Sequence, residues 1–166
     1  SNSSRRSRRC WPSVTPSAAD ACASRSIGFL ILLILQAGKV GLLRRLARLA
    51  QGVDAHGLQR YFFSQDNALL ISHTLATQKA WTAVALRMPT HRLAADVLPG
   101  ASLYGLSHTQ GLCCFGGGLP CWCAGVLLGA IGISGGSVEE DIAIATQTLA
   151  RFSRERFSLT PCNESL

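Results

Sequence analysis

The stretch that decides the fold is residues 125–141, GVLLGAIGISGGSVEED, in which an apolar run meets an acidic segment across two glycines. The apolar run has the length and composition of a buried strand. The glycine pair supplies a turn, and Ser137-x-x-Glu140 is a capping box that begins a helix. The segment therefore predicts a strand, a turn and a helix in direct succession.

A glycine-rich turn of this kind often binds a phosphate, because free backbone N–H groups and the helix dipole favour an anion. Here Glu139, Glu140 and Asp141 fill the first helical turn and already complement the dipole. Neither G-x-x-x-x-G-K-[ST] nor G-x-G-x-x-G occurs. The turn is thus either structural, or it presents carboxylates and backbone N–H groups to a ligand that is not strongly anionic.

Working outward from this segment, the apolar runs Gly111–Phe115 and Trp122–Ser134 predict two strands that pair as a hairpin. Between them, Gly116, Gly117 and Gly118 are expected to form a wide turn, because glycine tolerates such backbone conformations easily. The strands do not alternate polar and apolar residues, which indicates burial on both faces or a subunit interface on one face.

The remaining elements follow from hydrophobic spacing and breakers. An alanine-rich helix is expected with Ala76, Ala80, Ala83 and Val84 on one face, and Pro89 stops it. Thr90 is expected to cap the short helix that follows. The expected elements are a strand over Leu58–Phe63 and helices over Val40–Ala50, Ala68–Leu86, His91–Val97 and Ser137–Arg154.

The net charge of +7 is confined to the first part of the chain. Residues 1–60 hold ten Lys and Arg against two acids, whereas residues 61–166 hold six against seven. A phosphate-binding surface needs clustered cations on the fold itself. The distribution therefore argues against nucleic-acid binding by the folded part.

The chain is expected to have four parts. Residues 1–26 form a disordered basic tail, and 27–52 hold an apolar segment and an amphipathic helix of undecided role. A domain covers 53–154, and 155–166 form a C-terminal tail. Because the apolar run Ile27–Leu35 is too short to span a bilayer, we expect a cytoplasmic protein, with export as the alternative if that run belongs to a signal peptide.

The seven cysteines do not form a disulfide framework or a zinc motif. Those inside apolar runs are expected to be small buried hydrophobes. The histidines lie on separate elements, and no catalytic constellation emerges from their spacing. His73 is the candidate metal ligand, with a packing role as the alternative. Lys79 either reaches the surface or points into a pocket.

In order along the chain, these residues resemble the GlcG/HbpS family, the haem-binding family that includes the C-terminal domain of PduO. The resemblance covers about 100 residues and is closest to the PduO-like branch. The matching pieces are Val53-Asp54-x-x-Gly57, Asp66-Asn67-Ala68, Ala76-x-x-Lys79-Ala80, Pro89-Thr90, Pro99-Gly100, Phe115-Gly116-Gly117-Gly118-x-Pro120 and Gly129–Asp141.

The resemblance implies an α+β fold in which helices flank an antiparallel sheet of about five strands, with profilin- or PAS-like layering. It also implies homo-oligomers and haem or, alternatively, a corrinoid as ligand. The family begins with a helix and then a strand, and a histidine on that helix can carry the haem. This chain departs from the pattern, because it has no histidine before His56 and no hydrophobic strand before Val53.

Three hypotheses follow. The leading one is a small-ligand-binding module without strong catalytic activity. Its pocket would be lined by Lys79, Gly116, Gly117, Gly118, Ser134, Gly135, Gly136, Glu139 and Asp141. The second is an accessory enzyme of haem degradation or of glycolate or diol utilisation, with Lys79, Glu139 and Asp141 transferring protons. The third is an oligomeric interaction subunit whose interface uses the alanine face and the apolar strands.

Overall fold

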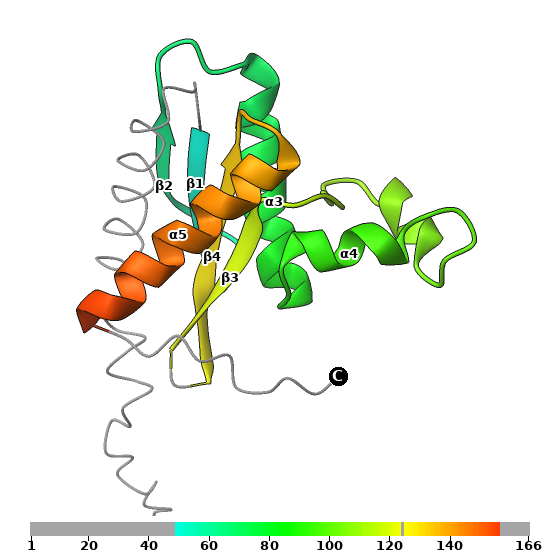
Figure 1. The fold of residues 1–166 in the computed structure, drawn as a ribbon. Coiled ribbons are helices and arrows are strands. Elements are labelled where there is room, and N and C mark those ends of the chain that lie inside the picture. The colour runs from blue at the N-terminus through cyan, green and yellow to red at the C-terminus, as the bar shows by residue number, and fades with distance from the viewer. Residues whose placement is uncertain (1–48, 124, 157–166) are drawn as a thin grey trace, which may run out of the picture.

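The computed structural model describes residues 49–123 and 125–156. Within them, four strands form one antiparallel sheet in the order β2-β1-β4-β3 (Figure 1). The predicted α+β class is confirmed, with four strands in place of about five. The elements are β1 (Leu49–Asp54), β2 (Gln59–Ser64), α3 (Leu70–Leu86), α4 (Thr90–Asp96), the 3-10 helix η1 (Tyr104–His108), β3 (Gly118–Cys123), β4 (Val126–Ser134) and α5 (Val138–Arg156).

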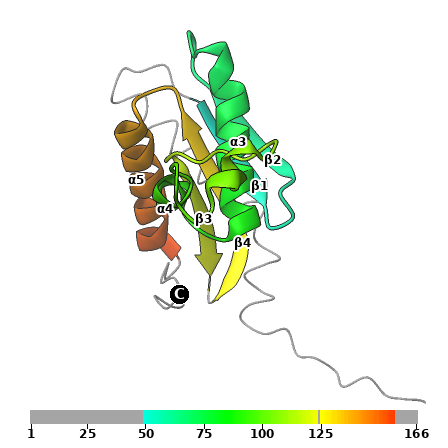
Figure 2. The same cartoon turned by 90° about the vertical axis from the view of Figure 1, so that its right-hand side faces the viewer.

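The sheet lies between two helices, α3 on one face and α5 on the other (Figure 2). Ala80, Ala83 and Val84 of α3 pack against Val53 and Ala130 of the sheet, which confirms the predicted apolar face of this helix. On the opposite face a second cluster forms around Ile131, Ile133, Ile144 and Ala145. Because both faces of β4 are buried, its sequence is apolar throughout and does not alternate.

Small residues let α3 lie directly on the sheet. A Cβ atom added to Gly132 of β4 would strike the backbone carbonyl of Ala76 and come within 2.7 Å of the backbone nitrogen of Ala80. Ala76 and Ala80 are themselves fully buried. This contact fixes the position of α3, and therefore of every side chain that α3 extends toward the sheet.

The hairpin prediction needs correction. The paired strands are β3 and β4, and Gly118 is the first residue of β3 and not part of the connecting turn. Gly111–Phe115 is not a strand. Its backbone is drawn toward α3, since the N–H of Cys113 donates a hydrogen bond to Oγ1 of Thr82 at 3.0 Å. An apolar run can thus be buried as a loop when a helix side chain accepts a hydrogen bond from its backbone N–H.

The predictions around β1 were also wrong. Leu49 and Ala50 lie in a strand and not at the end of a helix, and this strand extends before Val53. β1 is a central strand that pairs with β2 and β4, and all six of its residues are buried. Pairing on both sides satisfies its backbone, so tertiary context overrides a sequence with weak strand preference. The expectations for residues 1–48 and 157–166 fall outside the described residues.

The short helix α4 begins differently from the prediction. Pro89 is its N-cap residue, and Thr90 makes no capping hydrogen bond. Thr90 instead bonds to the backbone of Gly118, as described below. From there α4 and η1 extend away from the sheet, at the right in Figure 1. At the other end of the fold, α5 continues to Arg156, two residues beyond its predicted end.

Candidate functional site

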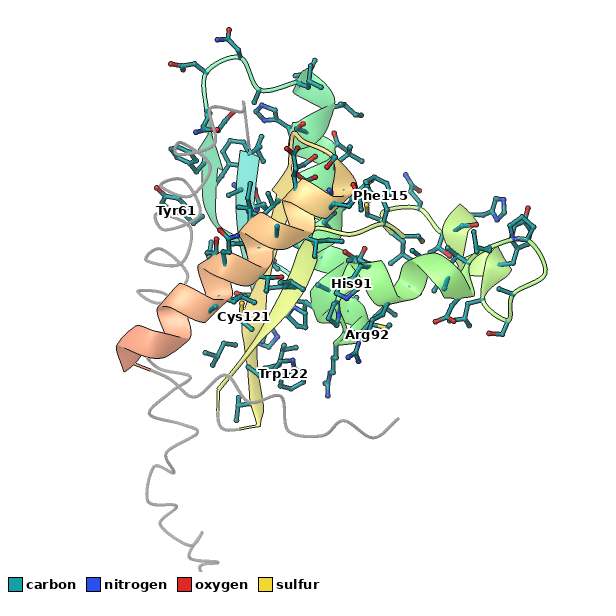
Figure 3. All side chains as sticks on the ribbon, viewed as in Figure 1. Tyr61, His91, Arg92, Phe115, Cys121 and Trp122 are labelled. Carbon is teal, nitrogen blue, oxygen red and sulfur yellow. The ribbon has the colours of Figure 1, made fainter. Side chains whose placement is uncertain are left out.

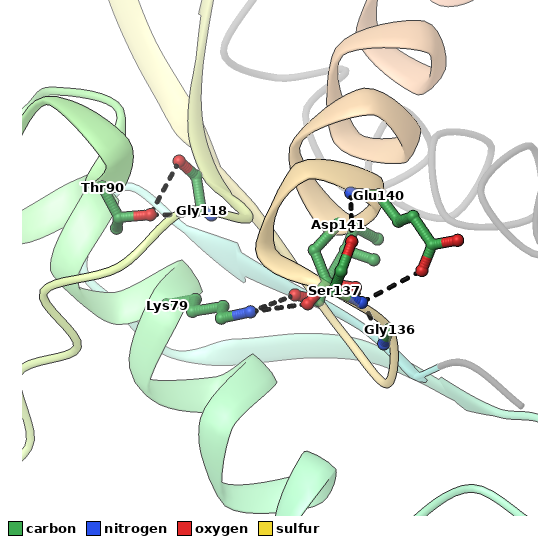
Figure 4. Close-up of polar contacts among 8 residues, drawn as sticks. Lys79, Thr90, Gly118, Gly136, Ser137, Glu140 and Asp141 are labelled. Atoms are coloured by element: carbon green, nitrogen blue, oxygen red, sulfur yellow. Dashed lines mark hydrogen bonds and ion pairs between the residues drawn. The ribbon is translucent and has the colours of Figure 1, made fainter. Parts of the chain in front are cut away.

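The start of α5 turns one carboxylate inward. The predicted capping box is present: the N–H of Ser137 donates to Glu140 at 3.0 Å, and the N–H of Glu140 donates to Oγ of Ser137 at 3.2 Å (Figure 4). With the cap satisfied in this way, the next carboxylate is directed into the protein. Asp141 is 2 % exposed and accepts a hydrogen bond from the N–H of Gly136 at 3.2 Å.

Lys79 reaches this carboxylate from α3, which lies on the other face of the sheet from α5. Its Nζ lies 2.8 Å from Oδ2 of Asp141 and donates to the backbone carbonyl of Ile133 at 2.9 Å (Figure 4). The Lys79 side chain is 1 % exposed and that of Asp141 is 3 % exposed. A buried ion pair is stable only when the geometry is good and further hydrogen bonds satisfy both ions, as they are here. The pair therefore ties α3, β4 and α5 together.

The segment of Gly116 and Gly117 that leads into β3, called the glycine loop below, closes over this ion pair. Gly117 has a φ of +117°, and a Cβ atom there would lie 2.9 Å from Nζ of Lys79 and 2.6 Å from the carbonyl oxygen of Ile133. The phenyl ring of Phe115 covers the ammonium, with its centroid 5.0 Å from Nζ. Such a cation–π contact adds attraction that strengthens as water is excluded. Glycine is thus needed where the loop approaches Lys79 this closely. The packed loop leaves no room for a ligand at the Lys79 side chain.

Thr90 anchors the other side of the loop. Its hydroxyl accepts a hydrogen bond from the N–H of Gly118 at 2.9 Å and donates to the carbonyl of the same residue at 3.4 Å. Thr90 is fully buried. The beginning of α4 is therefore fixed to the beginning of β3, beside the ion pair.

Most of the predicted pocket residues lie around one centre. The structure brings together Lys79, Gly116, Gly117, Gly118, Gly136 and Asp141, with Ser134 buried at the end of β4 and Gly135 in the turn after it. Glu139 is exposed and does not join them. His73 lies apart, with its ring 5.1 Å from the ring of Phe62 on β2.

Sequence reasoning missed the residues that form the outer rim of this centre. Phe115 is 39 % exposed although its ring covers Lys79. His91 is exposed on the first turn of α4, and its Cβ would lie 3.2 Å from a Cβ added to Gly116. Figure 3 labels both, together with the neighbouring Arg92. The available signals were the position of Phe115 at the start of one piece of the family pattern and that of His91 directly after another, Pro89-Thr90.

The described cysteines are not activated. Burial raises the pKa of the Cys113 and Cys114 thiols, and it raises the pKa of Cys121 to about 12. A thiol with a raised pKa is a poor nucleophile at neutral pH because little thiolate is present. Cys113 is buried, as predicted for cysteines inside apolar runs, and Cys121 on β3 is buried as well.

The third hypothesis loses its proposed interface. The alanine face of α3 is buried against the sheet of the same chain, and both apolar faces of β4 are buried under helices of the same chain.

In the ranges 49–123 and 125–156, no three metal-binding side chains gather in one place. Over the same two ranges, no helix combines the length and apolar character that crossing a bilayer requires.

The comparison with known proteins identifies the family of this chain. Residues 46–150 match the model described as "Haem degrading protein HbpS-like", and the chain belongs to that family. Two of the similar proteins carry the PduO name. The corrinoid adenosyltransferase PduO of Citrobacter freundii is 54% identical over 100 residues, which are 59% of this chain and 30% of that protein. The chain thus spans less than a third of that relative.

Two solved structures are similar to this one in fold. The crystal structure of PduOC in complex with heme has a TM-score of 0.72 and 45% identity, over 74% of this chain and 91% of that chain. The crystal structure of HbpS has a TM-score of 0.69 and 23% identity, over 75% of this chain and 87% of that chain. At that identity the second likeness concerns the fold alone.

The residues at the rim are of the types that hold haem. A haem iron takes an imidazole as axial ligand, the porphyrin needs an apolar or aromatic surface, and its propionates need cations. His91, Phe115 and Arg92 supply one of each, and all three are exposed. Side chains of these types are therefore available at the surface, outside the closed ion pair.

Proposed function

We propose that this domain is a small-ligand-binding module and that its ligand is haem, with a corrinoid as the alternative. The observation that carries the proposal is the likeness to PduOC in its complex with heme, at 45% identity over 91% of that chain. The corrinoid alternative rests on the name of the PduO relative. When bound, haem supplies an iron with a coordination position for a further ligand.

In this proposal the Lys79–Asp141 pair holds the binding surface and does not touch the ligand. Both side chains are almost fully buried, and their hydrogen bonds are taken by each other, Ile133 and Gly136. The loop that crosses the pair carries Phe115 to the surface. The pair therefore orients the residues that contact the ligand, and the ligand needs no cation or carboxylate from it.

A titration tests the proposal. Haemin and, separately, cobalamin are added to the purified full chain, and the absorption spectrum is recorded at each step. We expect a Soret shift that saturates near one equivalent of haemin. Phe115→Ala should weaken binding, because the ring is exposed at the rim. Leu58→Ala is the matched control, since Leu58 is an apolar residue that is 59% exposed on another part of the surface. No spectral change with either compound would reject the proposal.

A catalytic role is the second candidate, favoured by the family description as haem degrading. The proton-transfer scheme with Lys79, Glu139 and Asp141 gains no support from the geometry. Glu139 is exposed, whereas Lys79 and Asp141 are closed off from water. Degradation would appear as a time-dependent loss of the Soret band with release of iron in the presence of ascorbate and oxygen. A stable band under these conditions favours binding without turnover.

Self-association remains a proposal as well. If the chain is an oligomer, its interface cannot be the alanine face, which is internal. Exposed apolar side chains occur instead at the start of α3, where Leu69, Leu70 and Ile71 are each more than half exposed. Light scattering on the wild type and on a Leu70→Lys variant would test this surface. A lower mass for the variant is expected, and equal masses would assign the interface elsewhere.

A further inference from the structure

The outer face of α3 carries no charged side chain. Lys79 is the only Lys, Arg, Asp or Glu between Leu70 and Leu86, and its side chain is buried. Surface helices normally place charged residues on the side that faces water, as α4 does with Arg92 and Asp96, which are both exposed. The side of α3 that faces away from the sheet holds only neutral residues (Figure 2). An exposed helix face without charge is typical of the centre of a protein–protein interface.

Four exposed residues form a stripe along this face. They follow one another at intervals of four, three and four positions, which places them in one line along a helix. The stripe consists of Leu70, Thr74, Thr77 and Trp81. Leu70 is 85 % exposed, and Trp81 is 43 % exposed. The stripe therefore has a bulky apolar residue at each end and two small threonines in the middle.

The order of these four residues is symmetric about the middle of the stripe. If two copies of α3 pack antiparallel about a two-fold axis at that point, Leu70 of one copy faces the partner's Trp81. In the same arrangement Thr74 faces the partner's Thr77. The small threonines allow close approach in the middle, and at each end an indole packs against a leucine. The stripe is thus complementary to itself, as an interface between identical surfaces requires.

Two contacts within the chain prepare the stripe for burial. The hydroxyl of Thr77 donates a hydrogen bond to the backbone carbonyl of His73 at 2.9 Å, so burying this hydroxyl leaves no unpaired donor. The indole of Trp81 lies against Gly57, where an added Cβ atom would come within 2.9 Å of the ring. The ring is therefore held in place before association, which lowers the entropic cost of binding.

We propose that the outer face of α3 is the interface between two copies of this chain, which pack antiparallel through the stripe. This inference rests on the self-association proposed above, specifies its interface and does not depend on haem. A neutral face gains nothing from a charged partner, whereas two copies of it meet without repulsion. One helix pair is at the small end of specific interfaces, which remove about 800 Å² from each partner, so a dimer with a Kd in the micromolar range is expected.

The test introduces charge at the centre of the stripe. Sedimentation velocity over a concentration series gives the Kd of the dimer for the full chain and for the variants Thr74→Glu and Thr77→Lys, with circular dichroism as the check of folding. Each variant alone should weaken dimerisation at least about tenfold, because a buried charge would lack a partner. Thr146→Glu and Thr146→Lys are the matched controls and should dimerise like the wild type, since Thr146 is an exposed threonine on α5, on the other face of the sheet (Figure 2).

Mixing the two variants tests the antiparallel order. In a mixed dimer the carboxylate introduced by Thr74→Glu faces the ammonium introduced by Thr77→Lys, so an equimolar mixture should recover most of the wild-type association. A Kd unchanged in both variants would overturn the assignment of the interface, and no recovery on mixing would overturn the antiparallel order.

The wild type separates this inference from the other proposals. If it stays monomeric at about 100 μM, the self-association and this inference are both rejected. If it dimerises but binds no haemin in the titration described above, the proposed ligand is rejected and the interface stands.

Discussion

Two of the polar side chains buried between α3 and the sheet differ completely in their hydrogen bonding. Lys79, at one edge of the helix, has an ion pair with Asp141 and a hydrogen bond to Ile133. Gln51 of β1 is fully buried opposite Gly132, and neither its amide nitrogen nor its oxygen has a hydrogen-bond partner within the described residues. The contact between α3 and the sheet therefore contains one polar side chain with hydrogen-bond partners and one without.

The difference shows where the fold is rigid. Each unpaired buried polar group costs about 1–3 kcal/mol, whereas a paired and hydrogen-bonded ion holds its neighbours in one arrangement. The contacts around Lys79 involve α3, β4, α5 and the glycine loop, and the ring of the rim residue Phe115 lies over its ammonium. We infer that the Lys79 region maintains the binding surface and that the Gln51 region lowers stability.

Removing the cation should have the largest effect on stability. Lys79→Met leaves Asp141 charged and buried, which should lower the free energy of unfolding by about 3–5 kcal/mol. Urea unfolding followed by circular dichroism measures this. The double variant Lys79→Met/Asp141→Leu is the control, and it should recover much of the loss because no buried charge remains. A single variant as stable as the wild type would show that the pair is not essential to the fold.

The glycine that closes over Lys79 should be next. Gly117→Ala forces a side chain into a left-handed backbone and against Ile133 and Lys79, so a loss of about 2–4 kcal/mol is expected. Gly100→Ala is a matched control, because Gly100 also has a positive φ of +87° but nothing lies within 4 Å of its added Cβ. That variant should lose only about 1 kcal/mol. Equal losses in thermal unfolding would mean that close packing over Lys79 contributes nothing.

The Gln51 region should respond in the opposite direction. Gln51→Leu removes two unpaired polar atoms and keeps a similar volume, so the protein should gain about 1 kcal/mol of stability. Gln51→Ala leaves a cavity and should lose stability in the same urea experiment. If Gln51→Leu proves destabilising, the amide has a hydrogen-bond partner in solution, and the contrast with Lys79 disappears.

An effect that is about as small is expected at Asp54, which shares β1 with Gln51 but is well hydrogen-bonded. Burial raises the pKa of Asp54, but hydrogen bonds from the N–H of Leu58, from Arg60 and from the N–H of His56 outweigh it, so its pKa lies below its usual 3.8. A lowered folded-state pKa stabilises the protein above the unfolded pKa, and this contribution is lost as pH falls through the folded value.

The Asp54 effect is therefore tested by pH. Asp54→Asn should lower stability by about 1 kcal/mol at pH 7, a value discounted for the partly exposed Arg60. The difference from the wild type should shrink below about pH 4 as the carboxylate becomes protonated in both states. Asp66→Asn, at an exposed loop position, is the control and should stay within about 0.5 kcal/mol throughout. A difference independent of pH would assign the effect to shape and not to charge.

The predictable part of the fold was the part with local signals. The capping box at Ser137 and Glu140, the apolar face of α3 and the strand over Leu58–Phe63 all follow from spacing along a single segment. β1 could not be predicted, because its stability comes from pairing with strands that are distant in sequence. Gly111–Phe115 was misread because apolar composition does not distinguish a buried strand from a buried loop.

The sequence by itself determined the family, the glycine loop and the two residues of the ion pair, because each is carried by a short motif in chain order. Only the tertiary structure joined Lys79 to Asp141, which lie 62 positions apart, and closed the loop over them. It also separated His73 and Glu139 from the centre and placed His91 beside it. The positions of these side chains depend on which helix face packs against which strand. No local sequence pattern specifies such packing between segments that are far apart in the chain.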